Sequence, residues 1–300
     1  MEVNFFKDLE LEITRILSGF GYSVPSFEEL RAQDERADDA NKSYERYNIT
    51  NLMHHFLTVV KRRVPIKKWN VHVSLKLKNR VEIQNIASKL SAGEDVNRFL
   101  SKQVKRKKQK TCPDGTLYEW GIYHIHFELG GNGDDMLFVY LDENNAYLID
   151  ILPHEKENIT WTKSDLVQIL HDNWPQAISK HIFHNPLKDS ATPQSQRIIS
   201  DEERKHLRKK NGGANTIVND GVVYKKMGGG VTPSGIPFIA LRDTDAIISD
   251  IQKLQDDARA NKQAIYDFVD IQNPKLRLKL VLDDDLKIEI IEEITNTKMT

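Results

Sequence analysis

Residues 118–154 decide the fold of this chain. Residues 118–129 read YEWGIYHIHFEL, residues 136–142 read MLFVYLD, and residues 146–154 read AYLIDILPH. Each segment is rich in β-branched and aromatic residues and has the length of a strand. Turns rich in Gly, Asn and Asp separate the segments, and these residues suit tight corners. The stretch therefore predicts a three-stranded antiparallel meander.

The first strand of this meander carries two histidines on one face. Side chains alternate between the faces of a strand, so Tyr123 and Ile125 point to a predicted core, while His124 and His126 point to the opposite, polar face. The two imidazoles are roughly 6–7 Å apart along the strand. His154 follows the third strand, which runs in the same direction as the first in such a meander. We therefore expect an accessible polar face that His154 is able to approach.

The composition excludes a membrane or secreted protein with disulfides. The 300 residues are 39% hydrophobic and 29% charged, with a formal net charge of −1. No apolar run approaches the roughly 20 residues of a membrane span, and the N-terminal pattern contains charges that a signal peptide lacks. Cys112 is the only cysteine, which rules out an intrachain disulfide and a cysteine zinc cluster. We expect a cytoplasmic protein without a membrane partner.

Helical and strand patterns divide the chain into four predicted parts. Residues 1–68 form a helical N-terminal region, and residues 69–185 form a central helix-plus-meander domain. Residues 186–220 form a polar linker, and residues 221–300 form a C-terminal long helix and hairpin. The predicted fold class is α+β, with helices that lead into a central antiparallel meander and with additional N- and C-terminal α/β segments.

Apolar spacing also predicts the individual elements. Helices are expected at 3–18, 49–60, 79–90, 95–104, 160–174, near 200–210 and at 243–269, and further strands at 69–77, 276–282 and 286–291. The apolar stripe of 243–269 suits a protein partner or a second copy of the chain. Gly228, Gly229 and Gly230 follow a strand but lack the Gly-Lys-Ser/Thr ending of a phosphate loop, so a flexible loop is expected there.

The densest run of charge lies just before the meander. Residues 102–110 contain six cations and no acid, namely Lys102, Lys105, Arg106, Lys107, Lys108 and Lys110. Such a run is typical of a solvated loop or of a surface that contacts phosphates. Aromatic residues that could stack on bases lie in the same region: Trp120, Tyr123, Tyr140 and Trp161. These features favour a nucleic acid, and RNA in particular, as a partner.

The histidine pair allows three interpretations. Acting as general acid and base, the imidazoles would exchange protons with RNA oxygens near neutral pH, with the 2′-hydroxyl as nucleophile and without a metal. Acting as a His-x-His metal site, they would need a third ligand, for which the candidates are Glu128, His154, Asp150 and Asp172. In the third interpretation both histidines are structural residues under a helix. The residues alone leave all three open.

The order of the elements over residues 79–175 resembles the RelE/ParE-like superfamily of bacterial toxins. The resemblance rests on FLSKQVKR at 99–106, WGIYHIHF at 120–127, LFVYLD at 137–142 and YLIDILPH at 147–154. It implies a helical pair that leads into a curled antiparallel sheet. In the RNase branch of that superfamily, basic and aromatic side chains on the sheet's concave face cleave mRNA without metal. Carried over, it suggests these site residues: Lys105, Arg106, His124, His126, His154 and Lys156.

The leading hypothesis is a metal-independent endoribonuclease of toxin or phage-defence type, without a cofactor. His124, His126 and His154 are its predicted catalytic residues. The first alternative is a non-enzymatic nucleic-acid-binding or assembly component of a defence system. The second alternative is a metal-dependent nuclease that uses the His-x-His pair.

Overall fold

The chain folds into two compact units. The computed structural model describes residues 3–22, 24, 44–101, 114–154, 159–183, 198–269, 271, 273–282 and 286–299. One unit contains the described residues of Met1–Lys61 and Ala240–Thr300, and the other those of Arg62–Val104 and Gln109–Ile239. Helices and both mixed and antiparallel sheets are present, so the α+β prediction is confirmed. Over these ranges, no helix is both long and apolar enough to cross a membrane.

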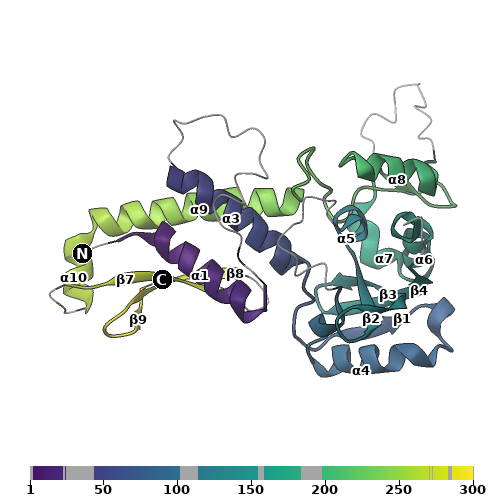
Figure 1. The fold of residues 1–300 in the computed structure, drawn as a ribbon, viewed down its shortest axis with the longest axis horizontal. Helices are drawn as coiled ribbons and strands as arrows, with labels where there is room; N and C mark the ends of the chain where they lie inside the picture. The colour runs from purple at the N-terminus through teal and green to yellow at the C-terminus, as the bar shows by residue number, and fades with distance from the viewer. Residues whose placement is uncertain are drawn as a thin grey trace. The chain divides into compact units, whose positions relative to one another are not determined.

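The first unit joins the two ends of the chain, which the sequence analysis placed in separate regions. Its elements are α1 (Phe5–Gly19), α3 (Tyr44–Lys61), α9 (Phe238–Ala260), α10 (Lys262–Val269), β7 (Leu276–Leu282), β8 (Leu286–Glu292) and β9 (Thr297–Lys298). Helix α1 packs along the predicted C-terminal hairpin of β7 and β8 (Figure 1). The buried carboxylate of Asp8 joins them, because it accepts hydrogen bonds from Arg277 Nη1 at 2.8 Å and from the Leu278 N–H at 3.1 Å.

The apolar stripe of α9 is buried within this unit. Ile248 and Ile251 are buried, and the side-chain oxygen of Gln255 accepts a hydrogen bond from the Phe5 N–H at 2.8 Å. Asn261 separates α9 from α10. The single helix predicted over 243–269 is therefore two helices, and the part of the stripe on α9 packs inside the chain.

The second unit is built on a four-stranded mixed sheet. The strands are β1 (Asn70–Val73), β2 (Ile122–Glu128), β3 (Asn132–Asp142) and β4 (Asn145–Pro153), in the order β1-β4-β3-β2. Strands β2, β3 and β4 form the antiparallel meander, and β1 pairs in parallel with β4. The strand predicted over 69–77 ends at Val73, where the Ser74 hydroxyl donates to the Ile149 carbonyl at 2.6 Å and the 3-10 turn η1 (Leu75–Leu77) begins.

Helical elements cover both faces of this sheet (Figure 1). On one face, η2 (Val81–Ile83) and α4 (Gln84–Ala92) pack against Ile125, Leu137 and Leu148. On the other, α5 (Gly115–Trp120), α6 (Asp165–Asn173) and α7 (Pro175–Ile178) pack against Ile122, Phe138 and Ile149. The face that carries the histidines is therefore a packed layer and not the open polar surface that strand alternation predicted.

The remaining elements of this unit are short. They are η3 (Asn97–Phe99), η5 (Ile159–Thr162), η6 (Ser179–His181), α8 (Asp201–Lys209), β5 (Thr216–Ile217) and β6 (Val223–Tyr224). A helix was predicted over residues 95–104, but the described residues of that range form only the 3-10 turn η3. There the Asn97 side chain bonds the N–H and the carbonyl of Val64, at 2.8 and 2.9 Å. Helix α8 lies in the predicted linker 186–220, yet Ser200 and Glu203 cap it and Arg204 is buried.

The three consecutive glycines support the end of α5. The Gly228 N–H donates to the Glu119 carbonyl at 3.2 Å, and the Gly230 N–H to the Tyr118 carbonyl at 2.6 Å. These bonds satisfy carbonyls that a helix end leaves without partners. A Cβ at Gly228 would lie 2.0 Å from the Leu117 carbonyl oxygen, and Gly230 has a φ of 85°. The segment is therefore a docked structural turn and not the flexible loop predicted from the sequence.

Candidate acid-base site on the meander sheet

The structure brings the three predicted histidines together. His124 and His126 share one face of β2, with ring centroids 6.1 Å apart. His154 follows β4, and its ring stacks on His126 with a centroid distance of 5.4 Å and an angle of 20°. The His154 N–H donates to the Asp134 carbonyl at 2.6 Å, which fixes the backbone at this point. The order of the meander thus places His154 beside the strand histidines.

The three histidines differ in their exposure to solvent. His126 is 1% exposed and the His124 side chain is 10% exposed, whereas His154 is exposed. The expectation that both strand histidines face solvent is therefore wrong. Phe138 and Trp161 pack against His124, and helices cover this side of the sheet. Of the three imidazoles, that of His154 is the one in a position to contact a substrate directly.

Trp161 links the histidine cluster to helix α8. Its ring centroid lies 4.7 Å from that of His124 and 5.2 Å from that of His154, with edge-on geometry in both contacts. Its carbonyl oxygen accepts a hydrogen bond from Arg208 Nη1. The partly exposed indole therefore stands next to His154, where it is able to stack on a bound base.

Asp114 lies behind His124 and was not predicted as a site residue. Its Oδ2 atom lies 3.2 Å from His124 Nδ1 and 4.0 Å from Arg62 Nη2. The contact with His124 lacks the alignment of a hydrogen bond. Its Oδ1 atom caps α5, accepting from the Thr116 hydroxyl at 2.9 Å and the Leu117 N–H at 3.1 Å. Because Asp is a preferred N-cap residue, the sequence signal for Asp114 was the start of a helix and not a histidine partner.

Burial and neighbouring charges set the protonation of this pair. Burial lowers the pKa of His124, and the charge of Asp114 only partly opposes this. Burial alone would raise the pKa of Asp114, but His124, Arg62 and two hydrogen bonds outweigh it and lower the pKa. At neutral pH the pair is therefore a carboxylate beside a neutral imidazole.

The candidate metal ligands do not form a metal site, although His154 lies beside His126. Over the ranges that the structure describes, no three His, Cys, Asp or Glu side chains are grouped so as to hold a metal ion. Asp150 instead forms an ion pair with Lys76 at 3.1 Å, and Asp172 accepts a hydrogen bond from Gln168 at 2.7 Å. The His-x-His alternative therefore has no third ligand in the described part of the chain.

The predicted RNA-binding cations lie outside the described residues. They are Lys102, Lys105, Arg106, Lys107, Lys108, Lys110 and Lys156. Two acidic residues, Asp134 and Asp135, lie at the start of β3 beside the end of β4 and thus near His154. These carboxylates oppose the binding of a phosphate at His154.

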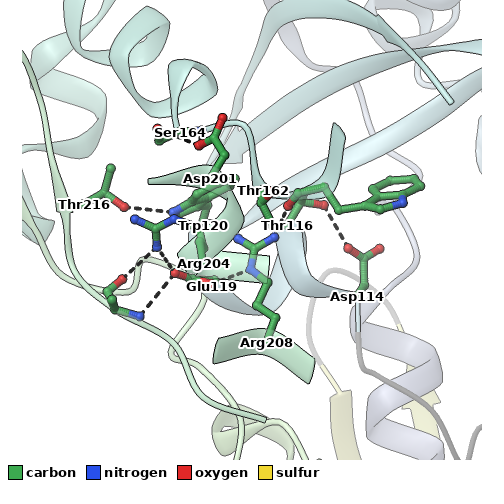
Figure 2. A network of polar contacts seen from close by, with 12 residues as sticks. Asp114, Thr116, Glu119, Trp120, Thr162, Ser164, Asp201, Arg204, Arg208 and Thr216 are labelled. Atoms are coloured by element: carbon green, nitrogen blue, oxygen red, sulfur yellow. Dashed lines mark hydrogen bonds and ion pairs between the residues drawn. The ribbon is translucent and has the colours of Figure 1, made fainter. Parts of the chain in front are cut away.

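A second group of buried charges centres on Glu119 (Figure 2). Its carboxylate accepts hydrogen bonds from Arg204 Nη1, from Arg208 Nε and, at 3.3 Å, from the Ala214 N–H. Both guanidinium groups lie over the Trp120 ring, 5.1 and 4.3 Å from its centroid. The sequence signal that we missed is the i, i+4 spacing of Arg204 and Arg208, which places both on one face of α8.

Comparisons with protein-family models, with curated proteins and with solved structures gave no match. The likeness to RelE/ParE-like toxins therefore stands on the sequence motifs alone. A function for this chain has to be argued from the geometry of its own residues.

Proposed function

We propose that this protein is a metal-independent endoribonuclease of toxin or phage-defence type, in which His154 contacts the RNA. The supporting observation is a continuous row of groups from a buried carboxylate to an exposed imidazole. Asp114 lies 3.2 Å from His124, the rings of His124 and His126 are 6.1 Å apart, and those of His126 and His154 are 5.4 Å apart.

In this proposal His154 is the general base. Its neutral imidazole removes the proton from a 2′-hydroxyl, and the resulting oxygen attacks the adjacent phosphorus. The bond from phosphorus to the 5′-oxygen breaks, and the leaving oxygen takes up a proton from water. An imidazole suits this role because its ordinary pKa is close to neutral. Trp161 orients the RNA by stacking on a base next to the reacting phosphate.

The two buried histidines are positioning residues. His126 holds the His154 ring by stacking. His124 in turn contacts the rings of His126 and Trp161 and supports them. The nearby carboxylate of Asp114 favours positive charge in the row once His154 has accepted a proton. The cations of 102–110 and Lys156 supply the attraction for phosphate. A single cysteine and an RNA substrate both agree with a cytoplasmic location.

Expression in a bacterial host tests this proposal. The wild-type chain should arrest growth and degrade RNA, and His154→Gln should do neither at the same protein level. His206→Gln is the matched control, because His206 is an exposed imidazole on α8. Equal toxicity and RNA loss with His154→Gln would contradict the proposal. Cleavage by the purified protein that disappears with a chelator would favour the metal-dependent nuclease.

The burial of His124 and His126 favours a second candidate, a non-enzymatic nucleic-acid-binding or assembly component. In that case the imidazoles only fill the packed layer. The basic run binds nucleic acid, and α10 contacts a protein partner or a second copy, because it contains no buried residue and exposes 67% of Phe268. Neutralising residues 105–110 weakens nucleic-acid binding and its salt dependence under both candidates. If the wild-type chain leaves RNA intact, that result would select the second candidate.

A further inference from the structure

The outer side of strand β1 carries backbone groups that no strand of the described chain uses. β1 is the last strand on this side of the sheet and pairs only with β4. The N–H groups of Asn70 and Ser74 donate toward β4, to carbonyls in the segment 144–148, at 2.8 and 3.0 Å. Backbone groups alternate in direction along a strand, so the N–H and carbonyl groups of Val71 and Val73 point away from β4. An edge of this kind is a template for a further strand.

Exposed apolar side chains adjoin this edge. Val73 on β1 exposes 41% of its surface, and Leu75, two residues further along, exposes 79%. Val81, in the turn η2 that follows, exposes 69%. Natural proteins commonly place charged residues on an open edge or cover it, because an apolar edge pairs with other chains. The apolar side chains at this edge therefore indicate an interaction surface.

The segment that contains β1 is also basic. Residues 66–82 contain five cations and one acid, Glu82. Lys67 and Lys68 precede the strand, and Lys78 follows η1, so that cations flank the open edge at both ends. Lys68 and Lys78 are exposed.

The nearby carboxylates do not neutralise these lysines. Glu82 pairs with Arg80 at 3.2 Å, and Asp150 of β4 pairs with Lys76 at 3.1 Å. Among the described residues, no carboxylate forms an ion pair with either of the two exposed lysines that flank the edge. Complementary charge across an interface steers association and excludes partners of like charge. Negative charge is therefore favoured at both ends of a bound segment.

We propose that the outer edge of β1 binds an extended segment of a partner protein, apolar in its centre and acidic at both ends. The segment adds a strand to the sheet through the N–H and carbonyl groups of Val71 and Val73. Its apolar side chains cover Val73 and Leu75, and its carboxylates meet the flanking lysines. A nucleic acid fits this surface less well, because it has no use for the strand hydrogen bonds or the apolar side chains. The proposal does not depend on the nuclease function.

Fluorescence anisotropy of a labelled synthetic peptide, measured with the full chain, tests this surface. The peptide has Val-Thr-Val-Thr-Val in its centre and two glutamates at each end. Saturable binding that weakens as salt is added is expected for the wild type. A second peptide with lysines in place of the glutamates should bind about tenfold more weakly or less.

Two variants separate the backbone contribution from the charge. Val73→Pro removes an N–H that β4 does not use, a position at which an edge strand tolerates proline, and it should weaken binding about tenfold. Val73→Thr keeps that N–H and is the control. The double variant Lys68→Glu/Lys78→Glu reverses the charge at both ends without touching the strand, and it should also weaken binding about tenfold. Its control is Lys253→Glu on α9, where the lysine side chain is 72% exposed.

Thermal unfolding establishes that each variant is folded before its affinity is compared. Absence of saturable binding to the wild type, or wild-type affinity in Lys68→Glu/Lys78→Glu, would overturn the proposal. Size-exclusion chromatography without peptide addresses a second copy: a wild-type dimer that Val73→Pro dissociates would assign the edge to self-association instead. A single-stranded RNA that binds more tightly than the peptide, and that loses affinity in Lys68→Glu/Lys78→Glu, would assign the surface to nucleic acid.

Discussion

Replacing Glu119 by Gln is the perturbation for which the structure gives the largest expected loss of stability. The carboxylate neutralises two buried guanidinium groups, those of Arg204 and Arg208, and also accepts the Ala214 N–H. Removing one partner of a buried ion pair costs about 3–5 kcal/mol, because the remaining charge is left uncompensated. In a unit of about 150–250 residues, 1 kcal/mol lowers the Tm by about 2–4 °C. Glu119→Gln should therefore lower the Tm by about 6–20 °C on the same scale.

Thermal unfolding followed by circular dichroism at pH 7 measures this effect. Glu202→Gln is the matched control, since the Glu202 side chain is 56% exposed and pairs with Lys205 at 3.8 Å on α8. Such pairs contribute about 0–1 kcal/mol, so the control should unfold within about 4 °C of the wild type. A Glu119→Gln variant that unfolds together with the control would refute the buried network.

Three further predictions concern the backbone, the first unit and pH. Gly228→Ala should lower the Tm more than Gly221→Ala does, because the new Cβ at residue 228 would collide with a backbone carbonyl. At Gly221 only the positive φ opposes a side chain, at a cost of about 1–2 kcal/mol. Equal losses of Tm in the two variants would contradict the docked turn. Asp8→Ala should lower the free energy of unfolding by about 2–3 kcal/mol in urea titrations, because the buried Leu278 N–H loses its charged acceptor. Burial lowers the pKa of His124, so below about pH 6.5 the unfolded chain binds more protons than the folded one and stability falls as the pH falls. His124→Gln should flatten that decline below about pH 6.5, and an unchanged slope would count against a buried neutral imidazole.

Local patterns were sufficient to predict the meander and the C-terminal hairpin. Alternation of side chains and turn residues specify such elements within a few residues of sequence. The parallel pairing of β1 with β4 was not predictable in this way. Nor was the packing of α1 against β7, because the ion pair of Asp8 with Arg277 joins the two ends of the chain. Such contacts depend on the tertiary fold and leave no local signal.

The candidate site was only partly predictable, because tertiary contacts leave no local signal there either. Strand alternation places His124 and His126 on one face, and strand order allows His154 to approach it; the structure brings the three rings together. Their burial depends on helices on both sides of β2 in the sequence, so alternation alone gave an open face. Asp114 and Trp161 approach His124 from separate elements, and neither contact has a sequence pattern of its own.

The rate of RNA cleavage by purified wild-type protein and by His154→Gln, both in the presence of a chelator, shows whether His154 is the general base of a metal-independent ribonuclease. A general base contributes about 10²–10⁴-fold to such a reaction. The wild type should therefore cleave RNA without metal, His154→Gln should lose about 100-fold or more of that rate, and His206→Gln should be unchanged. Cleavage by His154→Gln at the wild-type rate, or intact RNA with the wild type itself, would contradict it.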